Sequence, residues 1–260
     1  MRSEPVVVAL PGTLCSPAVF RPLAHALDGQ AVVDPVSWLT QPGPWDIPAV
    51  AERVAQHIGG RWDRPVVVCG HSTGGAIALQ LAATSPELVL GLVVADTGAH
   101  MRGHGDVDAI LTRVRNDWGE ELRAAVLDRS FLTPLSPEIR AECLQWAAGL
   151  NQQAVYDVLA SQRDLDLTSS LAQITQPVIV VHGRHDRARP PQNGEELAAA
   201  LPDAEFRLAE SGHTPVYETP ALVADAIRDV LRRVNPGMSR ASRVSRSRAA
   251  THPAPPNRDS

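Results

Sequence analysis

A serine in a glycine-flanked turn, between an apolar run and an alanine-rich segment, constrains the fold of this chain more than any other feature. The turn, Gly-His-Ser-Thr-Gly, occupies residues 70–74 and contains Ser72. The apolar run predicts a buried strand over residues 66–69, and the segment after the turn predicts a helix over residues 75–84. A sharp strand-to-helix turn of this kind, a nucleophile elbow, holds the serine hydroxyl clear of the sheet. Backbone N–H groups at the helix N-terminus favour negative charge developing there.

Apolar runs alternate with amphipathic segments along most of the chain. The runs are continuous, as in parallel strands that are covered on both faces. This alternation predicts an α/β fold with a doubly wound, mostly parallel sheet. We expect strands over residues 6–10, 31–36, 66–69, 89–95, 178–181 and 204–208. We expect the helices between them over residues 22–27, 47–58, 75–84, 195–201 and 221–234.

The alternation stops near residue 98 and resumes near residue 177. The intervening segment predicts helices over residues 107–118, 120–129, 136–149 and 152–163. It is long enough to cover the carboxyl edge of the sheet as a helical lid, inserted late in the sheet. We therefore expect a core of residues 1–98 and 174–234 and a helical cap of residues 99–173.

Composition limits the class of protein. With 260 residues, 44% of them hydrophobic, the chain is long enough for one large α/β domain or two small ones, with a sizeable core. No apolar run approaches the ~20 residues of a membrane span. The first predicted strand begins after five residues, which leaves no room for a signal peptide. We expect a cytoplasmic protein with no membrane partner, whose cysteines, Cys15, Cys69 and Cys143, are buried and reduced.

Residues 235–260 have a different composition, rich in arginine, serine and proline. Five arginines and one aspartate give this tail a formal charge of +4, while the whole chain carries −5. The tail has too few apolar residues to fold alone, so we expect a disordered extension. An arm that binds nucleic acid or an acidic partner is the alternative, and nucleic acid is not the expected partner.

The chain contains no lysine, so all 24 of its Lys-plus-Arg residues are arginine. This excludes a P-loop lysine, a Schiff-base lysine and a serine–lysine dyad. A serine hydroxyl needs a base to remove its proton, and for Ser72 histidine is the remaining candidate. That histidine in turn needs a carboxylate to orient it.

Both partners follow Ser72 in the chain order expected of an elbow serine. Asp186 follows the predicted strand 178–181, and His213 follows the last predicted strand. Both lie at the carboxyl ends of strands, where open α/β sheets bind their ligands. Asp96, directly after the strand 89–95, is the competing acid, although we expect it to bind loop amides instead. The histidines next to these positions, His71, His182 and His185, are expected to pack within their turns and loops.

An oxyanion hole needs two backbone N–H groups. Thr73, directly after the nucleophile, is expected to supply one of them. The other is expected from the loop after the first strand, where Gly12 allows the backbone to turn inward. We assign it to Thr13, with Leu14 as the neighbouring alternative.

Taken together, these motifs resemble the α/β-hydrolase superfamily, in its esterase-like branch with a helical cap. The resemblance covers about residues 5–234 and rests on four motifs. These are Pro-Gly-Thr at 11–13, Gly-His-Ser-Thr-Gly-Gly at 70–75, Gly-Arg-His-Asp at 183–186 and Gly-His-Thr-Pro-Val-Tyr-Glu-Thr-Pro at 212–220. The resemblance implies Ser72 as nucleophile, Asp186 as acid and His213 as base, with no metal or organic cofactor.

Two departures from the family pattern concern the pocket. Pro11 replaces the histidine that is common in the oxyanion loop, which changes the packing of the loop but not its amide donors. Residues 33–38 lack the usual Gly-x-Gly-x-Ser turn, so the substrate preference of family members that have it does not carry over.

Several side chains have two readings. Cys15 either lines the pocket or is simply a buried thiol, and Trp118 and Trp146 either wall an acyl site or pack in the cap. His100 and His104, near Asp106, are expected to be loop residues rather than metal ligands.

We therefore expect a serine hydrolase that cleaves a small carboxylic ester, lactone or thioester through an acyl-enzyme, with a small-molecule acyl substrate. A biosynthetic enzyme that uses the same triad for elimination, cyclisation or acyl transfer is the alternative. A ligand-binding receptor that retains the fold is the third hypothesis.

Overall fold

The computed structural model describes residues 4–102, 104–105 and 107–235. Its described residues form one six-stranded sheet with the order β2-β1-β3-β4-β5-β6, in which every neighbouring pair is parallel. The predicted α/β fold with a parallel sheet is confirmed. The strands are β1 (Val6–Leu10), β2 (Val32–Pro35), β3 (Val66–His71), β4 (Val89–Ala95), β5 (Val178–Gly183) and β6 (Ala204–Ala209).

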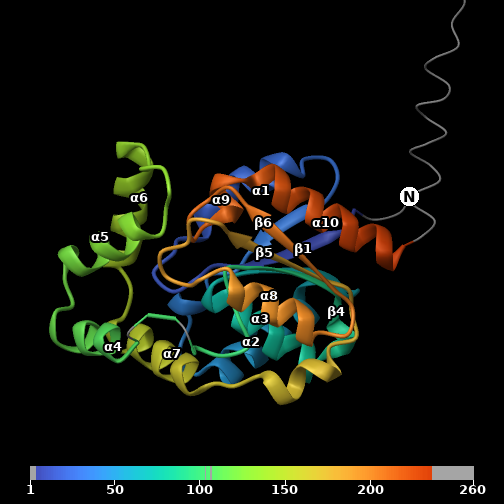
Figure 1. The fold of residues 1–260 in the computed structure, drawn as a ribbon, viewed down its shortest axis with the longest axis horizontal. Coiled ribbons are helices and arrows are strands. Elements are labelled where there is room, and N and C mark those ends of the chain that lie inside the picture. Colours follow the sequence, from blue (N-terminus) through green and yellow to red (C-terminus); the bar gives the residue numbers. More distant parts are fainter. Residues whose placement is uncertain (1–3, 103, 106, 236–260) are drawn as a thin grey trace, which may run out of the picture.

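Helices cover both faces of this sheet because successive strand residues point to opposite sides. Val7 and Ala9 of β1 pack into the cluster formed with α1 and α10, whereas Val8 packs into the cluster formed with α2, α3 and α8. Figure 1 shows these two helical layers, one on each side of the sheet. The helices are α1 (Arg21–Ala26), α2 (Ile47–Arg61), α3 (Thr73–Thr84), α8 (Gln192–Ala200) and α10 (Pro220–Val234).

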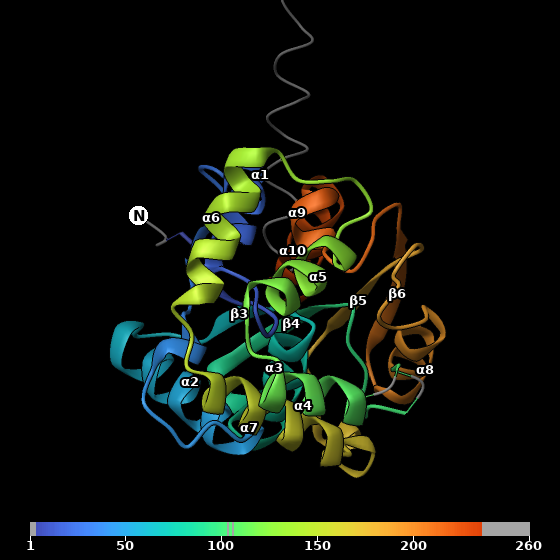
Figure 2. The ribbon, with the colours of Figure 1, turned by 90° about the vertical axis from the view of Figure 1, so that its left-hand side faces the viewer.

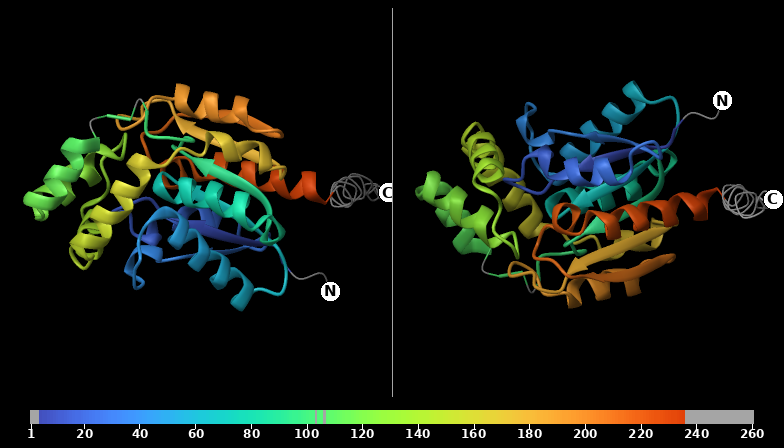
Figure 3. Two further views of the ribbon diagram at one scale, coloured as in Figure 1. Left: turned by 90° about the horizontal axis from the view of Figure 1, so that it is seen from below. Right: turned by 90° about the horizontal axis from the view of Figure 1, so that it is seen from above.

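Within the described residues, four α-helices are inserted between β4 and β5. The insertion follows the fourth of the six strands, so it lies mid-sequence, and the expectation of a late insertion needs this correction. In Figures 2 and 3 these helices lie together at one side of the molecule, against the core. They are α4 (Val107–Asn116), α5 (Glu120–Arg129), α6 (Pro137–Ala148) and α7 (Gln152–Asp164).

The starts of the last two of these helices follow from their capping residues. The hydroxyl of Ser136 accepts a hydrogen bond from the Ile139 amide, and the side chain of Asn151 accepts from the amides of Gln153 and Ala154. A capping side chain of this kind satisfies amides that have no partner inside the helix.

Shorter elements complete the described chain. They are the 3₁₀ helices η1 (Pro17–Phe20), η2 (Trp38–Thr40), η3 (Pro86–Leu88) and η4 (Thr168–Gln173), and the one-turn helix α9 (Pro215–Glu218). Within the described residues, no helix is both long enough and apolar enough to cross a membrane. Apart from Asn235, the predicted tail of residues 235–260 lies outside the described part of the chain.

Candidate active site

The turn between β3 and α3 holds Ser72 in a conformation that few residues adopt. Its φ of 54° lies in the left-handed region, which is unfavourable for a residue with a side chain. The close approach of the chain explains the flanking glycines: a Cβ on Gly74 would lie 2.0 Å from the carbonyl oxygen of Leu10. The Ser72 amide donates to the carbonyl of Ala95 at 2.8 Å, which fixes the turn to β4.

The structure brings Ser72, His213 and Asp186 together at the carboxyl edge of the sheet. The Nε2 atom of His213 lies 2.9 Å from the Ser72 hydroxyl oxygen, and its Nδ1 atom lies 2.6 Å from Oδ2 of Asp186. His213 is 7% exposed. One imidazole thus connects a hydroxyl to a carboxylate, which is the arrangement that removes a proton from serine.

Asp186 is held as an acceptor. Its Oδ1 atom accepts hydrogen bonds from the amides of Ala188 at 2.7 Å and Arg189 at 3.1 Å. Burial acts to raise the pKa of Asp186, but the charge of His213 and hydrogen bonds from neighbouring side chains hold it well below its usual range. Asp186 is therefore ionised and can stabilise an imidazolium on His213.

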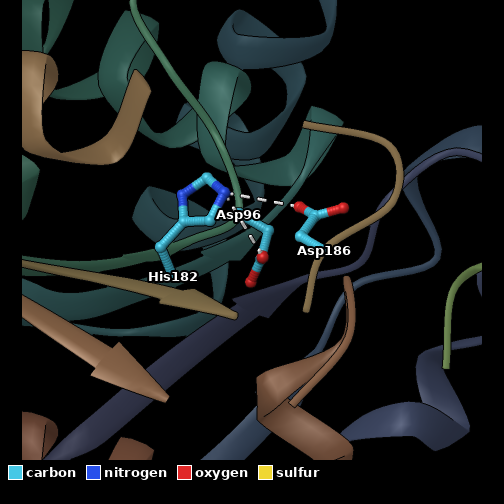
Figure 4. Close-up of side chains that lie close together, drawn as sticks. All are labelled: Asp96, His182 and Asp186. Atoms are coloured by element: carbon cyan, nitrogen blue, oxygen red, sulfur yellow. Dashed lines mark ion pairs between the residues drawn. The ribbon is translucent and has the colours of Figure 1, made fainter. Parts of the chain in front are cut away.

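Two further buried side chains surround Asp186, as Figure 4 shows: His182 and Asp96. His182 Nε2 lies 3.4 Å from Asp186 and 3.7 Å from Asp96, and it is also within 3.2 Å of the Arg189 carbonyl. Asp96 accepts a hydrogen bond from the Gly183 amide at 3.0 Å. One side-chain nitrogen or oxygen atom from each of these three residues lies within 4.8 Å of those of the other two. Because Asp186 is engaged with His213, the cluster acts as a buried hydrogen-bonded support for that carboxylate.

Asp96 differs from Asp186 in protonation. Burial, and next the charge of Asp186, raise the pKa of Asp96 well above its usual value, so Asp96 is the neutral member of the pair. A neutral carboxyl has no charge with which to stabilise an imidazolium. This observation favours Asp186 over Asp96 as the acid.

The two residues expected to supply the oxyanion hole lie against each other. The hydroxyl of Thr13 donates to the hydroxyl of Thr73 at 2.8 Å, and both residues line the cavity in front of Ser72. Within the described chain, no acceptor is recorded for the amides of Thr13, Leu14 or Thr73. These amides are therefore available to a ligand, and Leu14, with a φ of 65°, stays the alternative to Thr13.

His71 packs beneath this site. Its Nδ1 atom accepts from the Gly12 amide at 3.3 Å, and its Nε2 atom lies 2.6 Å from the His213 carbonyl oxygen. Burial, and then the charge on His213, lower the pKa of His71 to about 3, so the ring is neutral with one donor and one acceptor. His71 thus joins the oxyanion loop to the loop that carries His213, in the packing role expected from the sequence.

One hydrogen bond joins the two segments that depart from the family pattern. The indole nitrogen of Trp38 donates to the Pro11 carbonyl at 2.9 Å. Trp38 is buried and begins η2, so this segment supports the oxyanion loop in place of a glycine-rich turn.

A cavity of about 70 Å³ opens in front of Ser72, between the core and the inserted helices. Trp118 and Trp146, which were expected either to wall an acyl site or to pack in the cap, pack at the edge of the core cluster. Cys15 lines the cavity, and burial raises the pKa of its thiol to about 12, which leaves it protonated. The apolar side chains that line the cavity include Leu14, Ile110, Val114, Leu122, Val126 and Leu159.

Sequence reasoning did not assign Gln162 or Arg189 to the site, and it expected His104 to be a loop residue. Gln162 accepts a hydrogen bond from the Thr73 hydroxyl at 2.8 Å. Arg189 is 2% exposed, and its guanidinium donates to the His100 carbonyl. His104 lines the cavity rather than standing in solvent, while its neighbour Asp106 lies outside the described residues. No local motif marks Gln162 or Arg189, because their hydrogen-bond partners come from other elements.

Comparison with known proteins identifies relatives of this chain. A pimeloyl-(acyl-carrier protein) methyl ester esterase of Neisseria meningitidis is 27% identical over 214 residues, which cover 75% of this chain and 81% of that protein. The enzyme of the same name from Aromatoleum aromaticum is 31% identical over 185 residues, or 64% of this chain and 74% of that protein.

Solved structures show the same fold. The enol-lactonase of Burkholderia xenovorans superposes with a TM-score of 0.79 at 20% identity, over 88% of this chain and 92% of that chain. A family model described as "Alpha/beta hydrolase family" matches residues 7–226. Since that match covers most of the chain, this protein belongs to the alpha/beta hydrolase family.

Proposed function

We propose that this protein is a serine esterase that hydrolyses a small carboxylic ester, lactone or thioester through an acyl-enzyme. The contact of His213 with both Ser72 and Asp186, in front of a cavity, carries the proposal. The names of the relatives and of the lactonase are consistent with it, because methyl esters and enol lactones both present an acyl carbon bonded to oxygen.

In the first step, Ser72 Oγ attacks the acyl carbon while His213 Nε2 takes the hydroxyl proton. The carbonyl oxygen becomes an oxyanion, which the amides of Thr13 and Thr73 receive. When the oxyanion collapses, the bond to the leaving oxygen or sulfur breaks, and His213 gives its proton to that atom. The acyl group is then bonded to Ser72.

In the second step, water attacks the acyl carbon and gives a proton to His213. The bond to Ser72 Oγ breaks, His213 returns the proton to that oxygen, and the carboxylic acid leaves. Each oxyanion-hole amide is worth roughly 3–4 kcal/mol of transition-state stabilisation.

The inserted helices act as the cap in this proposal. Side chains from α4, α5 and α7 line the cavity, and most of them are apolar. A docked cap would keep bulk water from the acyl group and strengthen the electrostatic interactions at the oxyanion. The proposal keeps the predicted division into a core of residues 1–98 and 174–234 and a cap of residues 99–173.

The test is a panel of short acyl esters, lactones and acyl thioesters, assayed with wild type and Ser72→Ala. We expect at least one class to be hydrolysed by wild type, with about 10⁴-fold or greater loss in Ser72→Ala. Ser169→Ala is the matched control. It changes an exposed serine that is distant from Ser72 in the sequence, and it should keep wild-type rates. Full turnover in a folded Ser72→Ala protein would rule out the mechanism.

A further inference from the structure

A chain of hydrogen bonds connects the cap to the oxyanion hole. The Thr13 hydroxyl donates to the Thr73 hydroxyl at 2.8 Å, and the Thr73 hydroxyl donates to Oε1 of Gln162 at 2.8 Å. These residues come from three separate places: the loop after β1, the start of α3 and the last turn of α7. The chain therefore links both segments of the expected oxyanion hole to a cap helix.

Gln162 is a polar side chain in a buried position, which requires a physical explanation. It is 7% exposed, and it faces the cavity in front of Ser72. Burying an amide side chain is unfavourable unless its polar atoms are paired, and Oε1 finds its partner in the Thr73 hydroxyl. A leucine at this position would fit an apolar cap interface without that cost, so packing alone does not account for a glutamine.

The helix that carries Gln162 is firmly joined to the core. Ala154, Val155 and Val158 of α7 are fully buried in the main core cluster. The Ser161 hydroxyl, one residue before Gln162, accepts from the Ile47 amide at the start of α2 at 2.9 Å. The position of Gln162 is thus fixed from the core.

The cap helix α4 is joined to the same helix. The side-chain amide of Gln152, at the start of α7, donates to the carbonyls of Val114 and Arg115 in α4 at 2.8 and 3.0 Å. Hydrogen bonds thus connect α4 to the helix that carries Gln162, and the bonds from Gln162 through Thr73 to Thr13 continue this connection to the expected oxyanion hole.

We propose that Gln162 is a positioning residue of the oxyanion hole: through the hydroxyls of Thr73 and Thr13, the docked cap holds in place the two backbone segments whose amides receive the oxyanion. The inference rests on the proposed esterase function. A small misplacement of donors matters because they act on charge that develops only in the transition state. Loss of the chain should therefore lower kcat and leave KM nearly unchanged.

The test compares steady-state hydrolysis of p-nitrophenyl acetate by wild type, Gln162→Met, Thr73→Val and the double variant. Methionine removes the acceptor at similar length, and valine removes the hydroxyl while keeping the Thr73 backbone amide. We expect each single variant to lower kcat about 10- to 100-fold, with KM within about twofold. The double variant should be no slower than the slower single variant, because both substitutions break one chain.

A second readout separates the oxyanion hole from general packing. Ser72 Oγ adds to the carbonyl carbon of an aryl trifluoromethyl ketone and forms a stable tetrahedral oxyanion. It forms no stable adduct of this kind with the unfluorinated ketone. The variants should lose affinity for the fluorinated ketone by the same factor as kcat/KM and keep their affinity for the unfluorinated one. Gln153→Met, an exposed position on the same helix, is the matched control and should behave as wild type.

Three outcomes overturn the inference: unchanged kcat in either folded single variant, a loss confined to KM, or additive losses in the double variant. If Gln162→Met does not fold, Thr73→Val decides alone, because it leaves the cap helix untouched. A wild type without Ser72-dependent turnover overturns the proposed function, and this inference with it. Normal wild-type turnover with unaffected variants overturns this inference alone.

Discussion

The two buried aspartates near His213 show how environment separates identical side chains. Burial acts to raise the pKa of Asp186, but the charge of His213 and the hydrogen bonds from His182 and His213 outweigh it, so the pKa falls. Burial, and next the charge of Asp186, raise the pKa of Asp96, although the hydrogen bond from the Gly183 amide acts to lower it. One negative charge is retained where the imidazole needs it, and the second carboxyl avoids a like-charge contact by holding a proton.

Asp96→Asn should therefore change stability in a pH-dependent way. The folded-state pKa of Asp96 is raised, so wild type loses the stability that this proton carries as the pH rises from about 4 towards that folded pKa. Asparagine keeps a neutral group next to His182, Asp186 and Arg189, and tolerates the φ of 50°. Relative to wild type, the variant should gain up to about 1.4 kcal/mol per pH unit across that window.

Urea unfolding of both proteins at pH 5 and pH 7 measures this difference. A difference in unfolding free energy that stays constant between the two pH values would mean that Asp96 is ionised in the folded protein. Catalysis is a separate readout, and the variant should keep its Ser72-dependent turnover, since Asp96 makes no recorded hydrogen bond to His213 in the described chain.

At the scale of elements, one glutamate joins the His213 loop to the segment after α5. Glu218, at the end of α9, accepts hydrogen bonds from the amides of Gly212 at 2.8 Å, Leu132 at 2.8 Å and Thr133 at 3.1 Å. The two segments are in close contact, because a Cβ on Gly212 would lie 2.7 Å from the Leu132 nitrogen. This glutamate of the last motif therefore has a structural explanation.

Glu218→Ala should lower the free energy of unfolding by about 2–4 kcal/mol, because three backbone amides lose a charged acceptor. Glu210→Ala is the control. Glu210 pairs with Arg184 and His185 on the surface, where an ion pair is worth about 1 kcal/mol or less. Chemical denaturation of both variants measures the contrast. Equal losses in the two variants would show that the amide contacts of Glu218 carry no special weight.

Local patterns predicted elements well and contacts between elements poorly. The buried strands β1, β3, β4 and β5 stand out as continuous apolar runs, and the turn at Ser72 carries its own glycines. The start of α8 was predicted at residue 195 but lies at Gln192, because the helix begins directly after Pro191. The bond between Gln162 and Thr73 joins residues 89 positions apart, so no sequence window contains it.

At the scale of the molecule, the candidate site lies between two bodies of structure. The sheet presents Ser72, Asp186 and His213 at its carboxyl edge, and the inserted helices close the space above them. The roles of these residues stay predictions, although their positions agree with the chemistry expected from the sequence. The cavity that remains, about 70 Å³, is small compared with the several hundred Å³ of a typical ligand pocket.

This size predicts a preference for short acyl groups. An apolar cavity of about 150 Å³ holds a benzene ring, so the smaller space here should suit acyl chains of about two to four carbons. For p-nitrophenyl esters, kcat/KM should fall by at least about tenfold between butyrate and octanoate, because a longer chain must displace the cap. A kcat/KM that rises up to octanoate would contradict this, and would mean that the cap opens readily.

The central claim is that Ser72 becomes acylated during turnover. The most direct measurement mixes the protein with p-nitrophenyl acetate, quenches in acid within milliseconds, and determines the mass of the intact chain and of its peptides. The account predicts one acetyl group on the peptide that contains Ser72, and none on that peptide in Ser72→Ala. An acetyl group that never appears there while wild type turns over the ester, or one that appears equally in the variant, would contradict it.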